Sequence, residues 1–368
     1  MRNSVRLLLI IALSANAYSA DNDVAAFNAA WQAYEAAAQS DDITLRAETA
    51  ARVVGAGKQI FDESDEQLAI ITHNYGVALS DSGNREDAVP VLVEALRLGE
   101  ITYGKDGAGI IPILADLADA AAKPLEPEPQ LRHYKKALKI TKMNFGGDSV
   151  EYADLAFRAA RNVYQMSRSL RARKHMLEAR EIYAGLPEPA TLNIGMADFY
   201  RGKMEFTDRD FRHSSEYLES ALTGFEGAGG ANQAFRLLTR ALLVQTYEQR
   251  GLTEQATQHC VAIGRESQLS PDQDYLPLFR VPPLYPVSML RARKSGNVDL
   301  AFTVDENGFV QDPVVVARKV NGKERSRPSD FDKAAIDAVK RFRYAPKFVD
   351  GEAVATTGVK TRISFALE

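Results

Sequence analysis

The feature that most constrains the fold is a repeat with a period of 42 residues, which runs from about residue 24 to residue 268. Small residues recur at this step in two columns, and larger residues recur in a third. The columns are Ala95, Ala137, Ala179 and Ala221, continued by Ile263; Gly76, Ala118, Ala160, Gly202 and Val244; and Leu92, Tyr134, Met176, Leu218 and Cys260. Two antiparallel helices cross closely only where side chains are small, so each unit is predicted to be a helical hairpin.

This spacing resembles that of the tetratricopeptide repeat, with lengthened helices or loops. The segment from Phe27 to Phe61 fits as a degenerate first unit, so six hairpins are expected over residues 24–268. The resemblance implies that they stack into a right-handed α-solenoid. Gln130 and Ser214 depart from the pattern because they occupy a slot that favours alanine. The proline-rich residues 123–129 are expected to form an extended loop.

A different pattern follows residues 269–281, which are predicted to be a short linker. Three prolines within residues 282–286 prevent a helix from continuing. From Gly296, apolar and other residues alternate as in a half-buried strand, and the turn residues 305–308 predict a return in a second strand. Pro313 in this second strand indicates a bulge or an unpaired edge, since proline has no N–H to give to a ladder.

Helical spacing after Ser329 predicts one helix, and a last alternating stretch predicts a closing strand. The residues of that strand predicted to face the core are Val359, Thr361, Ile363, Phe365 and Leu367. Residues 282–368 are therefore expected to form a small α+β domain with a three-stranded antiparallel sheet.

Several motifs in this segment occur in a fixed order. They are Pro283-Leu284-Tyr285-Pro286, Gly296-x-Val298, Phe302-x-Val304-Asp305-x-x-Gly308-x-Val310, Phe331-Asp332-x-Ala334-Ala335, Arg341-Phe342-Arg343-Tyr344-Ala345-Pro346 and Asp350-Gly351. Together with the closing strand they resemble the C-terminal domain of TonB-type energy transducers. One departure is Met289, where that family usually has alanine. The expected fold class is thus a multidomain chain, with a tetratricopeptide-like α-solenoid followed by a small TonB C-terminal-like α+β domain.

The start of the chain has the order of a secretory signal. Arg2 and Arg6 precede a short apolar run, and small residues follow up to Ala20. A membrane anchor is the alternative, but it needs about 20 apolar residues, and Ser14 and Asn16 shorten this run. Residues 1–20 are therefore predicted to be a signal peptide, and the periplasm is the expected location. The alternative location is the inner membrane, on its periplasmic side.

The sequence contains no recognisable catalytic or cofactor-binding motif. There is no Gly-x-Ser-x-Gly, phosphate-binding loop, His-Glu-x-x-His or dinucleotide fingerprint after a strand. Cys260, the only cysteine, lies in an apolar column and is predicted to be a buried, inert thiol. The charge of −4 is divided between an acidic repeat region and a C-terminal segment of +4, which does not favour nucleic-acid binding. We therefore expect no enzyme and no cofactor.

All five histidines lie in the repeat region, and His133, His175 and His259 fall in one 42-residue column. Equivalent residues on successive units lie at least about 8–10 Å apart, the packing distance of helices. Zinc holds its donors at about 2 Å, so one ion cannot bridge such a row. A surface stripe on the second helix of each hairpin is predicted instead of a metal site.

Binding surfaces remain. The solenoid offers a groove for helices or extended peptides. In the TonB family the last strand pairs with a short peptide segment of outer-membrane transporters. The resemblance therefore implies a partner-binding edge at Lys360, Thr361, Arg362, Ile363, Ser364 and Phe365. The alternative is a purely structural strand, whose Lys360 and Arg362 discourage edge pairing.

The expected function is that of a periplasmic interaction protein, with the helical repeats as scaffold and an envelope protein, such as an outer-membrane transporter, as partner. A membrane-anchored energy transducer of the TonB family is the alternative. The short apolar run and the absence of a long proline-rich spacer speak against it. An envelope hydrolase or transferase would need a convergent polar site, which the sequence does not offer.

Overall fold

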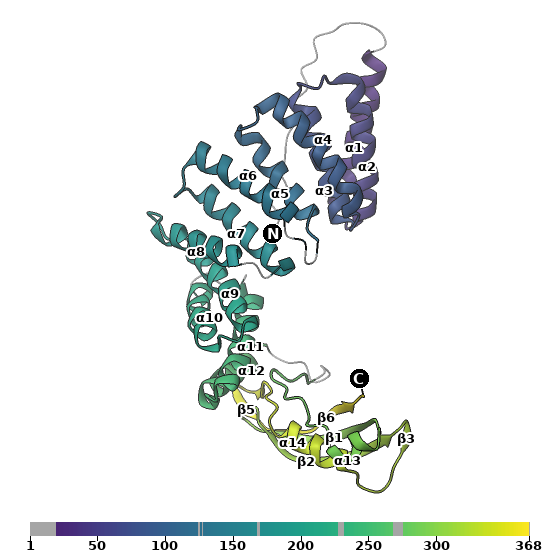
Figure 1. The fold of residues 1–368 in the computed structure, drawn as a ribbon, viewed down its shortest axis with the longest axis vertical. Helices are drawn as coiled ribbons and strands as arrows, with labels where there is room; N and C mark the ends of the chain where they lie inside the picture. Colours follow the sequence, from purple (N-terminus) through teal and green to yellow (C-terminus); the bar gives the residue numbers. More distant parts are fainter. Residues whose placement is uncertain are drawn as a thin grey trace. The chain divides into compact units, whose positions relative to one another are not determined.

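The computed structural model describes residues 20–123, 126, 128–167, 170–226, 232–267 and 275–367. The predicted signal peptide lies outside the described residues except for Ala20, where the first helix begins. The chain divides into two compact units, one ending at Ala172 and the other beginning at Arg173, which are described separately (Figure 1).

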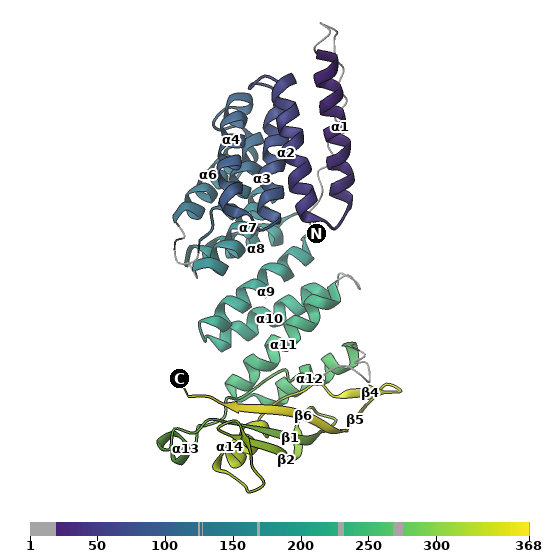
Figure 2. The ribbon, with the colours of Figure 1, turned by 90° about the vertical axis from the view of Figure 1, so that its right-hand side faces the viewer.

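The first unit is entirely helical. Its elements are α1 (Ala20–Gln39), α2 (Ile43–Ile60), α3 (Glu66–Asp81), α4 (Arg85–Tyr103), the 3-10 turn η1 (Ala108–Ile110), α5 (Ile111–Ala120), α6 (Glu128–Phe145), α7 (Val150–Ser167) and the first residues of α8 (Leu170–Gly185). Consecutive helices pack as the predicted hairpins, α1 with α2, α3 with α4, and α5 with α6 (Figures 1 and 2). The degenerate first unit is confirmed as the hairpin of α1 and α2.

The second unit continues the helices and ends in the α+β domain. It holds most of α8, then α9 (Thr191–Thr207), α10 (Phe211–Glu226), α11 (Gln233–Arg250), α12 (Thr253–Ser267), α13 (Val287–Arg291), β1 (Gly296–Val304), β2 (Val310–Val320), β3 (Lys323–Glu324), α14 (Asp330–Val339), β4 (Lys347–Val349), β5 (Glu352–Val354) and β6 (Thr356–Phe365). From α4 onward, the second helices of successive hairpins begin at Arg85, Glu128, Leu170, Phe211 and Thr253, in steps of 41 to 43 residues. The predicted period of 42 is thus the spacing of the helices.

The small-residue columns sit where the helices of a hairpin cross. Ala95, Ala137, Ala179 and Ala221 are all fully buried. A Cβ on Gly76 would lie 2.6 Å from Leu92 Cδ2, and a Cβ on Gly202 would lie 2.6 Å from Leu218 Cγ. The same pair of columns therefore makes the same contact in different hairpins. Ser214 fits the alanine slot because it is small and its hydroxyl donates to the carbonyl oxygen of Gly202 at 2.9 Å.

The extended loop predicted for the proline-rich residues 123–129 is shorter than expected. Residues 124, 125 and 127 lie outside the described residues, and α6 already begins at Glu128. Pro129 thus occupies the first turn of α6, where a missing N–H costs no helical hydrogen bond. Helix α6 therefore includes the last two residues of the predicted loop.

The α+β domain contains the three predicted strands as β1, β2 and β6. The four-stranded sheet has the order β3-β2-β1-β6, and β3 is a two-residue addition that follows the turn at Asn321-Gly322. The register between β1 and β2 shifts where Pro313 lies, between the pairs of Ala301 with Val314 and Thr303 with Gln311, so the predicted bulge is confirmed. Helix α14 covers one face, and Phe331, Ala335 and Val339 share its core with the inward residues of β1 and β6. The β4–β5 hairpin was not predicted.

The closing strand alternates as predicted up to Phe365, with one error at its end. Val359, Ile363 and Phe365 are buried and Thr361 is half-buried. Leu367 is 39% exposed and lies beyond the end of β6, so its assignment to the core is wrong. The pairing of β6 with β1 ends at Phe365, which pairs with Gly296. Leu367 lies beyond this pair, so the sheet does not hold it against the core.

Part of the predicted linker packs against the domain. Residues 268–274 lie outside the described residues. The amides of Leu278 and Phe279 donate to the carbonyl oxygen of Arg343 at 2.7 and 3.3 Å, and the amide of Arg343 donates back to Phe279 at 3.1 Å. The hydroxyl of Tyr275 donates to the carbonyl oxygen of Ala345 at 2.5 Å. Residues 275–279 are therefore fixed to the α+β domain.

Candidate functional site

The predicted partner-binding residues lie on a strand at the edge of the sheet. Strand β6 is last in the order β3-β2-β1-β6, and within the described part of the chain it pairs with β1 alone. Figure 2 shows β6 along one margin of the sheet, with β1 and β2 following in order. One row of its backbone N–H and C=O groups is therefore unpaired within the sheet.

The hydrogen bonds at the two ends of β1 tell which of its residues face β2. The amide of Asn321 donates to Ser295 at 2.8 Å, and the amide of Asp305 donates to Phe309 at 2.9 Å. Backbone groups alternate in direction along a strand, so the odd-numbered residues of β1 point towards β2. The even-numbered residues, including Val298 and Leu300, then point towards β6.

The pairing of β6 with β1 shows which backbone groups of β6 point away from the sheet. Val298 pairs with Ile363 and Leu300 pairs with Thr361, so the backbone groups of Ile363 and Thr361 point inward to β1. The intervening residues, Lys360, Arg362 and Ser364, direct their N–H and C=O groups outward, and their side chains are exposed. A strand added at this edge would bond to these three residues.

One of these three side chains is already engaged. Arg362 forms a bidentate ion pair with Asp299, its cross-strand neighbour, with Nε–Oδ1 and Nη2–Oδ2 distances of 2.6 and 3.0 Å. The hydrogen bond from Arg362 holds the pKa of Asp299 below its usual value. Only Lys360 and Ser364 therefore keep side chains that are free of this pairing. The sequence contains Asp299, but its role depends on strand register.

The inner face of the edge is fixed by aromatic contacts. Phe365 stacks on Phe331 of α14 with ring centroids 4.4 Å apart, and Tyr285 meets Phe365 edge to face at 5.8 Å. The Tyr285 hydroxyl donates to the carbonyl oxygen of Lys294. The Pro-Leu-Tyr-Pro motif thus positions the end of β6.

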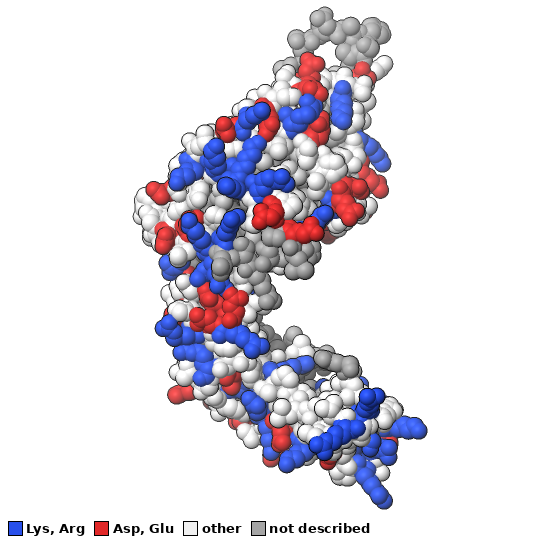
Figure 3. Space-filling model, viewed as in Figure 1, with Lys and Arg blue, Asp and Glu red and all other residues white. Residues whose placement is uncertain are grey.

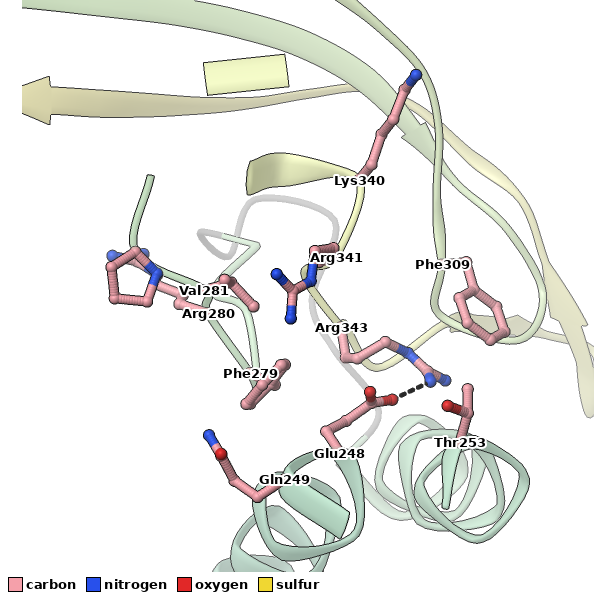
Figure 4. Close-up of a pocket in the computed structure, with 11 residues that line it drawn as sticks. Glu248, Gln249, Thr253, Phe279, Arg280, Val281, Phe309, Lys340, Arg341 and Arg343 are labelled. Carbon is pink, nitrogen blue, oxygen red and sulfur yellow. Dashed lines mark hydrogen bonds and ion pairs between the residues drawn. The ribbon is translucent and has the colours of Figure 1, made fainter. Parts of the chain in front are cut away.

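Arg343, from the Arg-Phe-Arg-Tyr motif, joins the domain to the last helical hairpin. Its side chain is only 2% exposed, and Nη1 lies 2.5 Å from Glu248 Oε1 on α11. Nη2 donates to Thr257 Oγ1 on α12 at 2.7 Å and to the carbonyl oxygen of Asn307 at 3.1 Å. The guanidinium also lies 3.7 Å from the ring centroid of Phe309 (Figure 4). No signal in the sequence linked Arg343 to Glu248.

A pocket of about 440 Å³ adjoins this contact and is lined mainly by residues of the domain and of α11. Phe279, Val281 and Phe309 supply apolar walls, and Arg341 and Arg343 supply charge. In Figure 4 the Arg341 guanidinium points into this space, whereas the Lys340 side chain points away from it.

Gly264 allows the close approach of the domain to α12, and Gly308 allows a close backbone contact within the domain. A Cβ on Gly264 would lie 2.2 Å from the carbonyl oxygen of Pro346. A Cβ on Gly308 would lie 2.1 Å from the carbonyl oxygen of Tyr344, and Gly308 also has a positive φ of 82°. The Cβ of Cys260, the last residue of its column, would lie 3.4 Å from a Cβ added to Gly308, and Cys260 packs with Ala345. The domain thus takes the place of a next hairpin against α12.

The burial of Cys260 predicts that its thiol reacts slowly in the folded protein. Burial raises its pKa to about 12 from a usual 9.0, which leaves about a thousandfold less thiolate at a given pH. We expect a disulfide reagent to modify the folded protein at least about 1000-fold more slowly than the urea-unfolded protein. Cys260 is the only cysteine, so the absorbance of the thiolate that the reagent releases measures the rate of its modification directly. Equal rates would contradict the packing role.

The histidine column is only partly as predicted. His133 and His175 are half-buried, but His259 is buried. It stacks on Tyr247 at 5.7 Å, and its Nε2 lies 3.1 Å from Glu219 Oε1. The surface-stripe prediction is therefore wrong for His259, because α10 and α11 supply partners that the column pattern does not reveal. Among the described residues, no group of three or more His, Cys, Asp or Glu side chains could hold a metal ion.

The fold and the edge define a helical-repeat chain that ends in a small α+β domain with one strand open to pairing. Residues 281–367 match the family model for the Gram-negative bacterial TonB protein C-terminal domain. The chain is 35% identical over 86 residues to Protein TonB of two Xanthomonas campestris pv. campestris strains, B100 and ATCC 33913. These alignments cover 23% of this chain and 35% of each relative, so the chain spans about a third of the relatives' length. The C-terminal domain is thus TonB-like, as predicted.

Two solved structures show a distant similarity to part of the chain. BtubC from P. vanneervenii is 18% identical, with a TM-score of 0.48 over 72% of this chain and 98% of that chain. PilF from Pseudomonas aeruginosa is 12% identical, with a TM-score of 0.40 over 66% of this chain and 93% of that chain. In the part of the chain that the structure describes, no helix has the length and apolar character needed to cross a membrane.

Proposed function

We propose that this chain is an interaction protein of the bacterial envelope, in which the TonB-like domain binds a partner by strand addition at β6. The supporting observation is the outer edge of β6, where Lys360, Arg362 and Ser364 direct their backbone groups away from β1. Backbone hydrogen bonds supply affinity in this mode of recognition, and alternating side chains supply selectivity. The helical hairpins serve as the scaffold that carries this edge.

The partner that we propose is an extended segment of an envelope protein, such as an outer-membrane transporter. The similarity to Protein TonB supports this choice. We also propose that residues 1–20 direct export to the periplasm, on the basis of their signal-like order. The Arg362–Asp299 pair leaves Lys360 as the cation available to an acidic partner residue at the edge.

Replacing Arg362 with proline tests the site. The change removes an outward N–H without removing an inward one, so the pairing with β1 is kept while a donor to the added strand is lost. We expect Arg362→Pro to abolish binding of a transporter-derived peptide by the whole chain, measured by calorimetric titration. Hydrogen exchange of residues 356–365 should slow on peptide addition in the unmodified chain but not in Arg362→Pro.

The matched control is Arg362→Ala, which also breaks the ion pair with Asp299 but keeps the N–H. We expect this variant to bind within about threefold of the unmodified chain, because exposed ion pairs contribute little. Equal loss in both variants would assign the effect to the side chain and contradict strand addition. Exchange protection of β1 must remain in both variants, which shows that the sheet is intact.

A further inference from the structure

Three aliphatic side chains stand out on the surface of the TonB-like domain. Leu284, Val287 and Leu290 are 86%, 60% and 51% exposed, and they lie within seven residues of one another. The residues between them behave differently, since Tyr285 and Met289 pack against the domain core. The segment thus buries one side and presents Leu284, Val287 and Leu290 on the other.

Six cations lie on the two segments that border this apolar surface. They are Arg291 at the end of α13, Arg293 and Lys294 after it, and Lys323, Arg325 and Arg327 around β3. The two segments lie side by side, because Ser295 and Asn321 exchange hydrogen bonds of 3.0 and 2.8 Å. Figure 3 shows Lys and Arg side chains gathered over α13 and β3.

Two acidic side chains lie near these cations: Glu324, and Asp330, which accepts a hydrogen bond from Ser288. Residues 291–294 contain no acidic residue, and residues 321–328 contain only Glu324, which lies 3.8 Å from Lys319. Within the described ranges, none of the six cations forms an ion pair, and five of the six are exposed. The surface therefore combines unpaired positive charge with aliphatic side chains that water solvates poorly.

The combination of exposed aliphatic side chains and unpaired cations favours one class of partner over others. A nucleic acid would use the cations but would leave the aliphatic side chains in water. The core of a protein–protein interface is depleted in charge and enriched in aromatic residues, whereas here the exposed apolar residues are Leu and Val. A membrane with anionic lipids satisfies both features, since aliphatic side chains enter the boundary of headgroups and acyl chains and cations meet lipid phosphates.

We propose that this surface, made of Leu284, Val287, Leu290 and the six cations, binds an anionic lipid membrane peripherally. The binding does not depend on the strand-addition site. The two surfaces are nevertheless linked, because Tyr285 packs on Phe365 at the end of β6. Membrane contact would thus hold the open strand edge close to the lipid surface.

Vesicle co-sedimentation of the whole mature chain tests this proposal. Vesicles of phosphatidylglycerol and phosphatidylcholine should sediment the protein, whereas vesicles of phosphatidylcholine alone should not, and added salt should weaken the binding. The triple variant L284S/V287S/L290S should bind the anionic vesicles at least about tenfold more weakly than the unmodified chain. The variant R291Q/R293Q/R325Q/R327Q should show a loss of the same size.

The matched control is V93S/I101S/L238S, which replaces three aliphatic residues that are 50%, 48% and 54% exposed in α4 and α11. It should bind like the unmodified chain, and circular dichroism should show all variants folded. Equal binding to both vesicle types, equal loss in the control, or loss only in the glutamine variant would overturn the proposal. So would retention of an anionic oligonucleotide by a chain that does not bind the anionic vesicles.

Discussion

Replacing Arg343 with methionine is expected to lower the stability of the second unit by about 3 kcal/mol, because the change leaves Glu248, whose side chain is 13% exposed, without its partner. It also removes the bonds to Thr257 and Asn307. Hydrogen exchange of α12 measures the effect, and peptides of α2 in the first unit serve as an internal reference. We expect faster exchange in α12 and unchanged exchange in α2.

The same substitution at Arg362 provides the matched control. Arg362 also forms a bidentate pair with a carboxylate, but the pair is exposed, so its loss should cost no more than about 1 kcal/mol. The double variant Arg343→Met with Glu248→Met should recover most of the lost stability, since no unpaired charge remains. Equal effects of the two single variants would contradict the role given to Arg343.

Replacing Gly264 with alanine is the second change with a large expected effect, and its sign is opposite to the usual one. Alanine in place of glycine inside a helix normally stabilises by about 1 kcal/mol. At Gly264, however, the new methyl group would lie 2.2 Å from the carbonyl oxygen of Pro346, which is backbone. Such overpacking costs about 1–3 kcal/mol. Calorimetric melting should therefore show a lower Tm.

Gly55→Ala is the control for Gly264→Ala. Gly55 lies inside α2, and nothing is within 4 Å of the position of its added Cβ. This variant should gain stability through helix propensity alone. A rise in Tm for both variants would show that the domain does not pack on α12 as described, whereas a fall for both would indicate that propensity is not the deciding factor.

The sequence predicted the parts of the fold that depend on local or periodic patterns. The columns through Ala137 and Leu92 placed the helix crossings, because a small residue at a crossing recurs wherever the crossing recurs. Alternation placed Ile363 inside and Ser364 outside, since side chains in a strand change sides at every residue. Pro313 located a bulge because its missing N–H is incompatible with continuous pairing.

The remaining features depend on partners far away in the chain. Arg343 contacts Glu248, and Arg362 contacts Asp299, but neither pair has a spacing that identifies it. His259 was expected at the surface because its column was read without the neighbouring helices that bury it. Leu367 looked like the next inward residue, although the strand had already ended. The first three misses concern which element packs against which, and the last concerns where a strand ends.

The 42-residue columns have a consequence for the gene as well as for the protein. Unequal recombination that removes or duplicates one block of 42 codons returns every remaining side chain to an equivalent slot. A block that lacks one residue inside a helix would turn the rest of that helix by about 100° and expose its small residues. Hairpin number can therefore change in a single genetic event, except at α11–α12, where Cys260 and Gly264 fit the TonB-like domain and not another repeat.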